Sequence, residues 1–224
     1  MEQMQPPGPL TRARLKTPRA AAIAGIVFSV LLTIAIVLLR ISAPATPGIK
    51  EGFAAREGTV LLALKLVPFA GIAFLWFIGV VRDRLGSYED RFFATVFFGS
   101  GILFLAMFFA APAVTGVMIM GLAAAPKLLI ESGAYLFGRA ISAQIMNVFA
   151  LKMAGVFMIS TATLAMRTHI LPRWITLPGY ALAALLLLSA RFADWLPLAF
   201  PLWVLVLSIY ILVENLRGTK PAAA

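Results

Sequence analysis

The segment Ser142–Met166 is a long apolar run that nevertheless carries a lysine near its middle. It is long and apolar enough to cross a bilayer as one helix. Lys152 lies about 15 Å along that helix from Ser142, at 1.5 Å per residue. A cation in hydrocarbon costs at least about 2.5–3.5 kcal/mol, so such a helix has to be enclosed by neighbours, with its polar side against protein or water. The segment therefore predicts a bundle of membrane helices.

The composition agrees with a membrane domain. Of the 224 residues, 62% are hydrophobic and 12% are charged, whereas a soluble domain has about 25% charged residues. The apolar runs are continuous rather than alternating, which disfavours a β-barrel. The chain has no cysteine, which excludes disulfides, thiol catalysis and cysteine-ligated metals. The net charge of +10 comes from bases that flank the apolar runs, so it indicates contact with the lipid bilayer rather than with nucleic acid.

We expect an all-α, polytopic transmembrane bundle of six spans. Residues 1–19 are predicted to be a disordered basic cytoplasmic tail, 20–213 the membrane domain, and 214–224 a second cytoplasmic tail. The expected spans are about 20–41, 59–81, 88–120, 141–166, 175–192 and 195–213. The third is over-long, so it is expected to tilt or to break near Pro112. Lys and Arg are more numerous on the side of the N-terminus, which predicts that both termini are cytoplasmic.

The segments between the predicted spans are expected to have different structures. Arg40–Gly58 contains Pro44 and Pro47 and is expected to be an irregular loop. Leu128–Phe137 mixes apolar and polar residues and is expected to lie along the membrane interface. Several glycines are expected to allow close helix packing: Gly71, Gly79, Gly99, Gly101 and Gly155.

The intramembrane lysines are the sharpest candidates for a binding site. Lys152 has Gln144 and Asn147 on the same span, and Lys65 lies about 9 Å into the second span. Both spans start from the same side, so the two lysines are expected to face one outward-opening cavity. Two interpretations stay open. The lysines hold an anionic group, or their ammonium groups bond backbone carbonyls and serve the fold.

A polar strip is predicted along one flank of the fourth span. On a regular helical wheel, Gln144 and Gly155 lie within about 80° of Lys152, and Thr163 returns to nearly the same side. The strip would either line a pathway or face another helix.

The second and third spans are joined by a short charged connection. Ser87 and Asp90 fit a capping box, so a defined turn is expected. The turn is either a solvated hairpin or a docking site for a cytoplasmic partner, and its candidate contact residues are Arg82, Arg84, Glu89 and Asp90. His169 is the single histidine, so neither a metal site nor a cofactor is expected.

Two parts of the chain carry a resemblance. They are Leu171–Trp174 with Phe200–Val204, and Arg82–Gly86 with Glu89–Phe93. These segments resemble uncharacterised bacterial six-helix integral membrane proteins. The resemblance implies a bacterial inner-membrane location and supplies no catalytic residues.

The chain also lacks the usual motifs of an enzyme, such as His-Glu-x-x-His or Gly-x-Ser-x-Gly. We therefore expect a non-enzymatic structural or accessory membrane subunit, which assembles as a homo-oligomer or with a membrane-protein partner. The alternative is a small transporter or channel that uses Lys152 and Lys65 for an anionic or amphipathic ligand.

Overall fold

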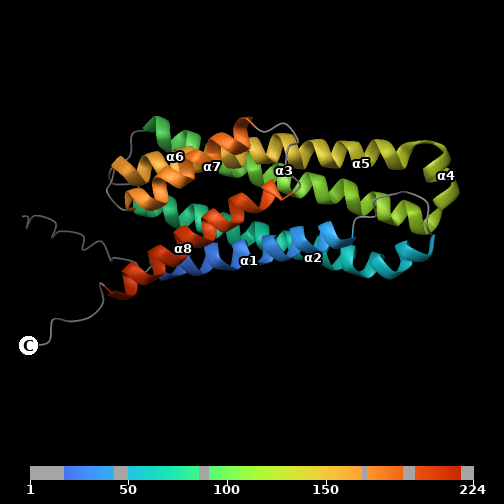
Figure 1. The fold of residues 1–224 in the computed structure, drawn as a ribbon, viewed down its shortest axis with the longest axis horizontal. Coiled ribbons are helices and arrows are strands. Elements are labelled where there is room, and N and C mark those ends of the chain that lie inside the picture. Colours follow the sequence, from blue (N-terminus) through green and yellow to red (C-terminus); the bar gives the residue numbers. More distant parts are fainter. Residues whose placement is uncertain (1–17, 43–49, 86–90, 168–170, 189–194, 218–224) are drawn as a thin grey trace, which may run out of the picture.

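The structure is a computed structural model that describes residues 18–42, 50–85, 91–167, 171–188 and 195–217, and these are almost entirely helical (Figure 1). In chain order the elements are α1 (Pro18–Ser42), α2 (Lys50–Leu85), α3 (Arg91–Ala124), α4 (Pro126–Glu131), α5 (Ala134–Gln144), the π-helix η1 (Ile145–Ala150), α6 (Leu151–Arg167), α7 (Arg173–Leu188), the 3₁₀ turn η2 (Leu196–Leu198) and α8 (Ala199–Arg217).

Within the described part of the chain, five helices are long and apolar enough to cross a membrane. These candidate spans are Arg19–Ile41, Gly58–Arg82, Ala94–Ala124, Ala134–Arg167 and Leu196–Arg217. The fifth predicted span, 175–192, corresponds to α7, a shorter apolar helix of 16 residues, and the sixth, 195–213, corresponds to α8. The expected all-α apolar bundle is confirmed, and the chain is a multi-pass membrane protein by the composition of its helices.

The helices run up and down along one long axis (Figure 1). α1 packs along α2 and α8, α3 lies between α2 and α6, and α6 forms an antiparallel hairpin with α7. The start of α1, the end of α8 and the α6–α7 turn share one end of the bundle, whereas α4 lies at the other end. α2, with 36 residues, is about 54 Å long, while α1, with 25, is about 38 Å long. The bundle therefore continues past α1 at the α4 end.

The prediction of an irregular loop from Arg40 to Gly58 is wrong for its second half. Residues 43–49 lie outside the described part, but α2 begins at Lys50 and runs on without interruption. After Pro47 the chain has good helix formers, including Ala54 and Ala55. Extending a helix that already exists avoids the cost of nucleation, so this segment joins the span that follows it.

The expected break at Pro112 is also absent, because α3 is helical from Arg91 to Ala124. Pro112 has no N–H to donate to the carbonyl of Phe108, four residues earlier, yet the helix continues. Beside the proline, the hydroxyl of Ser142 on α5 bonds the carbonyl of Ala111, which joins this turn of α3 to a neighbouring helix. Neighbouring helices and hydroxyl side chains commonly satisfy the backbone around a proline in a membrane helix.

The segment Leu128–Phe137 forms part of a helical tip. α4 and α5 are joined through Gly133, whose φ of 73° is the left-handed conformation that glycine adopts most easily. Neither helix has a buried residue. α5 continues through η1 into α6, so the fourth span begins near Ala134 rather than at 141. The placement of this tip along the membrane interface stays a prediction.

Phenylalanine rings fill the centre of the bundle. Phe200 of α8 lies 5.8 Å from Phe28, 5.7 Å from Phe74, 4.8 Å from Phe104 and 6.0 Å from Phe157, measured between ring centroids. These five rings come from five different helices, and each is at most 1% exposed. Most of the pairs are edge-to-face, an arrangement that stabilises aromatic contacts beyond the area they bury.

The five glycines that were predicted to allow close helix packing fall into two groups. A Cβ at Gly71 would collide with Phe109, one at Gly101 would lie 2.7 Å from Ile78 Cδ1, and one at Gly155 would lie 3.1 Å from the carbonyl oxygen of Ala183. The predicted packing role is confirmed for these three. It is wrong for Gly79 and Gly99, where a Cβ would meet nothing within 4 Å.

Candidate functional site

Lys152 is half-buried on α6 and points to α7. Its Nζ donates a hydrogen bond to the carbonyl oxygen of Leu187 at 3.4 Å. Leu187 is the next-to-last residue of α7, so its carbonyl is one of the four that a helix leaves without an internal partner. The C-terminal end of a helix also carries partial negative charge. The lysine therefore caps α7 from a neighbouring helix.

Two other residues of the predicted polar strip also contact α7. Gly155 packs against Ala183 and Leu187 of α7. The hydroxyl of Thr163 lies 2.7 Å from that of Tyr180, also on α7. Lys152, Gly155 and Thr163 thus face one helix along the antiparallel hairpin. We call this contact the α6–α7 seam, and it supplies the polar groups of α6 with partners from protein.

Gln144 does not belong to this seam, because its side chain is exposed on α5. The π-helix η1 lies between Gln144 and Lys152 and changes the rotation per residue there. Lys152 already bonds the next-to-last residue of α7, so the described part of α7 does not extend to Gln144, eight residues earlier in the antiparallel partner. Asn147, within η1, is half-buried, and η1 packs against α3.

Lys65 lies in a different environment. Its side chain is exposed on α2, which packs against α1 and α3, whereas Lys152 donates to α7. The structure thus places the two lysines on different pairs of helices. The shared outward-opening cavity stays a hypothesis.

A cluster of hydroxyl groups joins α3 to α5 near Pro112. Ser142 Oγ donates to the carbonyl oxygen of Ala111 at 2.9 Å, and Thr115 Oγ1 donates to the same oxygen at 3.1 Å. The two hydroxyl oxygens are 2.9 Å apart. We call these three residues the hydroxyl cluster. It joins α5, within the fourth span, to α3 at the residue before Pro112.

Of the residues proposed for a cytoplasmic partner, the structure describes the side chain of Arg82. The guanidinium of Arg82 lies 4.9 Å from the centre of the Phe98 ring on α3, a cation–π geometry. Glu89, Asp90 and the side chain of Arg84 lie outside the described part, as do the predicted capping box and His169. The docking site therefore stays a prediction.

Several residues that organise the bundle were not singled out from the sequence. The central phenylalanines had a detectable signal, since Phe97, Phe104 and Phe108 are spaced by seven and four residues, as on one face of a helix. Trp203, 4% exposed, packs its indole nitrogen against Gly179 and has no hydrogen-bond partner there. Its buried position has no signal in the pattern.

The chemistry available in the described part of the chain is limited. Among the residues that the structure describes, no group of three or more His, Asp or Glu side chains is arranged to hold a metal ion. Comparisons with protein-family models, with curated proteins and with solved structures return no match. The architecture alone therefore carries the assignment: a multi-helix apolar bundle, as in a polytopic membrane protein.

Proposed function

We propose that the chain is a non-enzymatic structural or accessory subunit of a bacterial inner membrane, with six spans and both termini in the cytoplasm. One observation carries the functional part of the proposal. The five converging phenylalanines occupy the middle of the bundle, where a transport pathway would need polar groups or space. The bond from Lys152 to Leu187 supports it, because the half-buried ammonium group has its acceptor within the α6–α7 seam.

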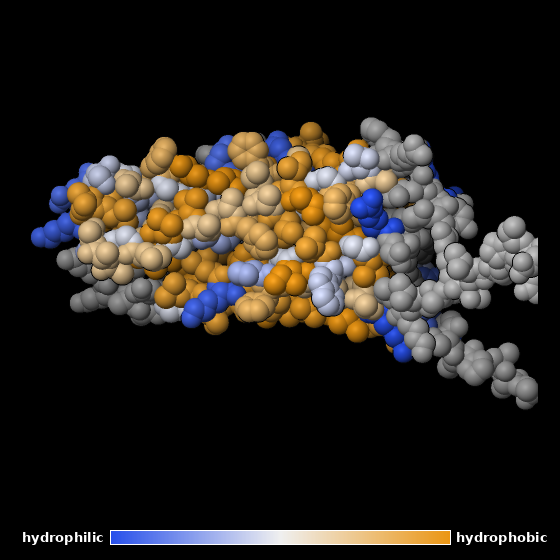
Figure 2. Space-filling view, turned by 180° about the vertical axis from the view of Figure 1, so that it is seen from behind, coloured by the Kyte–Doolittle hydropathy of each residue, from blue (hydrophilic) through white to orange (hydrophobic). Residues whose placement is uncertain are grey.

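The apolar exterior fits a protein that works through lateral contacts. Large apolar side chains are exposed on α1, α2, α3, α7 and α8, and Figure 2 shows them spread over the face in view. Lipid covers such a surface by default, and a partner helix covers it equally well, since membrane helices associate through packing rather than through a hydrophobic driving force. The bacterial location rests on the resemblance given above.

The orientation can be tested on a clean background, because the chain has no cysteine of its own. Ser132→Cys places a thiol on the exposed tip, and Ala222→Cys places one near the C-terminus. A membrane-impermeant maleimide added to intact spheroplasts should label the first variant alone, and both variants after lysis. Labelling of Ala222→Cys in intact cells would contradict a cytoplasmic C-terminus.

The functional proposal is tested by purification together with reconstitution. The tagged full chain, extracted in mild detergent, should bring down one membrane protein in fixed stoichiometry, or itself as a defined oligomer. In liposomes it should give no anion flux above that of empty vesicles. Flux that disappears in Lys152→Met, while the melting temperature stays within a few degrees of the wild type, would instead establish the transporter.

A further inference from the structure

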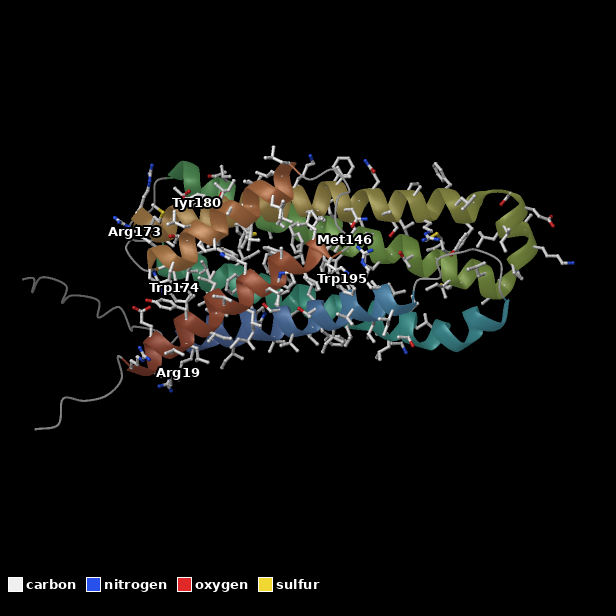
Figure 3. All side chains as sticks on the ribbon, viewed as in Figure 1. Arg19, Met146, Arg173, Trp174, Tyr180 and Trp195 are labelled. Carbon is white, nitrogen blue, oxygen red and sulfur yellow. The ribbon has the colours of Figure 1, made fainter. Side chains whose placement is uncertain are left out.

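Arginine residues mark one end of the bundle. The candidate span Arg19–Ile41 begins with an arginine, and the spans Gly58–Arg82, Ala134–Arg167 and Leu196–Arg217 end with one. α7 begins with a fifth, Arg173. The directions of the helices bring all five to the end that holds the start of α1 and the α6–α7 turn (Figure 1), and Figure 3 shows Arg19 and Arg173 there. All five side chains are exposed at the level where the apolar helices stop.

This end carries an excess of positive charge. Among the side chains that the structure describes there, Glu214 supplies the negative charge. At the opposite end, the tip has Lys127 and Arg139 with Glu131 between them. A guanidinium group is planar and can donate two parallel hydrogen bonds to a phosphate, which makes arginine well suited to hold one. The arginine end is therefore complementary to an anionic headgroup.

An aromatic pair lies at the same end, between α7 and α8. The rings of Trp174 and Tyr210 are 6.1 Å apart at an interplanar angle of 80°, so they meet edge to face. Arg173 directly precedes Trp174. Arg217 lies seven residues after Tyr210, two turns further toward the end of α8 and on nearly the same side of that helix. Each ring of the pair thus has one arginine on its own helix nearer the end of the bundle, Arg173 on α7 and Arg217 on α8.

The apolar side of the pair completes the pattern. Leu177 follows Trp174 by three residues, which puts it on the same side of α7 one turn deeper, and it is exposed. From the end of the bundle inward, the groups on α7 and α8 are guanidinium, aromatic ring and leucine. A diacyl phospholipid presents phosphate, ester and acyl chain in that order, and Trp and Tyr favour the ester level of a bilayer.

We propose that Arg173, Trp174, Tyr210 and Arg217 bind the headgroup of an anionic phospholipid. The two guanidinium groups donate to the phosphate oxygens, the indole and phenol rings pack at the ester level, and one acyl chain lies over Leu177. A zwitterionic lipid offers the same phosphate, but its ammonium group is repelled by the five arginines. The site needs no protein partner, so it stands apart from the subunit role proposed above.

Lipid titration of the purified full chain, followed by native mass spectrometry, tests this site. Phosphatidylglycerol should bind about 25-fold more tightly than phosphatidylcholine with the same acyl chains, since each of the two binding arginines contributes about 1 kcal/mol toward anionic lipid. By the same measure, the double variant Arg173→Gln/Arg217→Gln should lose about 25-fold in affinity for phosphatidylglycerol and little for phosphatidylcholine. The matched control, Lys127→Gln/Arg139→Gln at the tip, should bind as the wild type does.

Three results would overturn the proposal: equal affinity for the two lipids, an equal loss in the control variant, or displacement of the lipid by millimolar inorganic phosphate, which would indicate a site for a free anion. If the double variant does not fold, the salt dependence of lipid binding by the wild type tests the proposal instead. Raising the salt from 0.1 to 0.5 M should weaken phosphatidylglycerol binding and leave phosphatidylcholine binding unchanged. No such difference would also overturn the proposal.

Discussion

Lys152 and Leu187 are joined across the α6–α7 hairpin by a hydrogen bond of 3.4 Å from the ammonium nitrogen to the carbonyl oxygen. The bond pairs two groups that each lack a partner in the apolar interior of a membrane. A buried cation needs acceptors, and the last carbonyls of a helix need donors. Each group supplies what the other lacks, so the charge stabilises the hairpin.

Replacing Lys152 with methionine should therefore lower stability. The variant keeps the side chain's length but leaves the carbonyl of Leu187 without its donor. We expect a loss of about 1–2 kcal/mol in the free energy of unfolding, measured by denaturant titration in detergent micelles. Lys65→Met, on an exposed side chain of α2, should change stability by less than about 0.5 kcal/mol. A more stable Lys152→Met would show that the ammonium group is held at a cost for another role.

The aromatic centre should respond strongly to the loss of one ring. Phe200→Ala removes a side chain that contacts rings from four other helices and should cost about 3–5 kcal/mol. Phe200→Leu refills much of the volume and should cost less than about 1.5 kcal/mol. Phe69→Ala is the control, since Phe69 is exposed on α2. Equal losses in Phe200→Ala and Phe69→Ala would show that the rings do not form the core.

Features that depend on the local sequence were predictable, whereas those that depend on contacts between helices were not. A protein acceptor for Lys152 was predictable because a charge in hydrocarbon is costly, although the side chain is half-buried rather than enclosed. The identity of that acceptor was not, because Leu187 comes within reach only through the register of the α6–α7 hairpin. The exposure of Gln144 was missed because nothing in the sequence shows that α7 ends beside Lys152.

Pro112 illustrates the opposite error. A proline inside a helix predicts a break when its own helix is considered alone. α3 nevertheless continues through Pro112, and beside it the carbonyl of Ala111 accepts a hydrogen bond from Ser142, 31 residues away, a contact that the sequence of α3 alone cannot show. The central phenylalanines could have been found by their helical spacing, but their meeting at one point requires the packing of five helices.

Two glycines on α3 provide a matched test of helix packing. Gly101→Leu should force the new side chain into Ile78 and Phe157 and cost about 1–3 kcal/mol in unfolding free energy. Gly99 lies two residues earlier, on nearly the opposite side of the same helix, and a Cβ there would meet nothing within 4 Å. Gly99→Leu should therefore be neutral or should stabilise by up to about 1 kcal/mol through helix propensity. Thermal melts of the two variants in one detergent give the comparison. If both melt alike, α3 does not pack closely on α2 and α6 at Gly101.

The hydroxyl cluster near Pro112 should act as one unit. Ser142→Ala removes the donor that joins α5 to the carbonyl of Ala111 and should cost about 0.6–1.7 kcal/mol, the range for hydrogen bonds between membrane helices. Thr115→Val keeps the shape but removes the second hydroxyl, and the two hydroxyl oxygens lie 2.9 Å apart. The losses should therefore not be additive, so the double variant should lose measurably more or less than the two single variants together.

Unfolding measured on all four members of that double-mutant cycle gives the coupling energy, and Ser160→Ala is the control, since the Ser160 hydroxyl donates to the carbonyl of Val156 within its own helix. Amide hydrogen exchange shows in addition which part of the chain loses protection. Loss of Ser142 should speed exchange in the turn of α3 around Pro112, because that is where the helix depends on its neighbour. Additive losses with unchanged exchange would mean that α3 stays continuous through Pro112 without the help of α5.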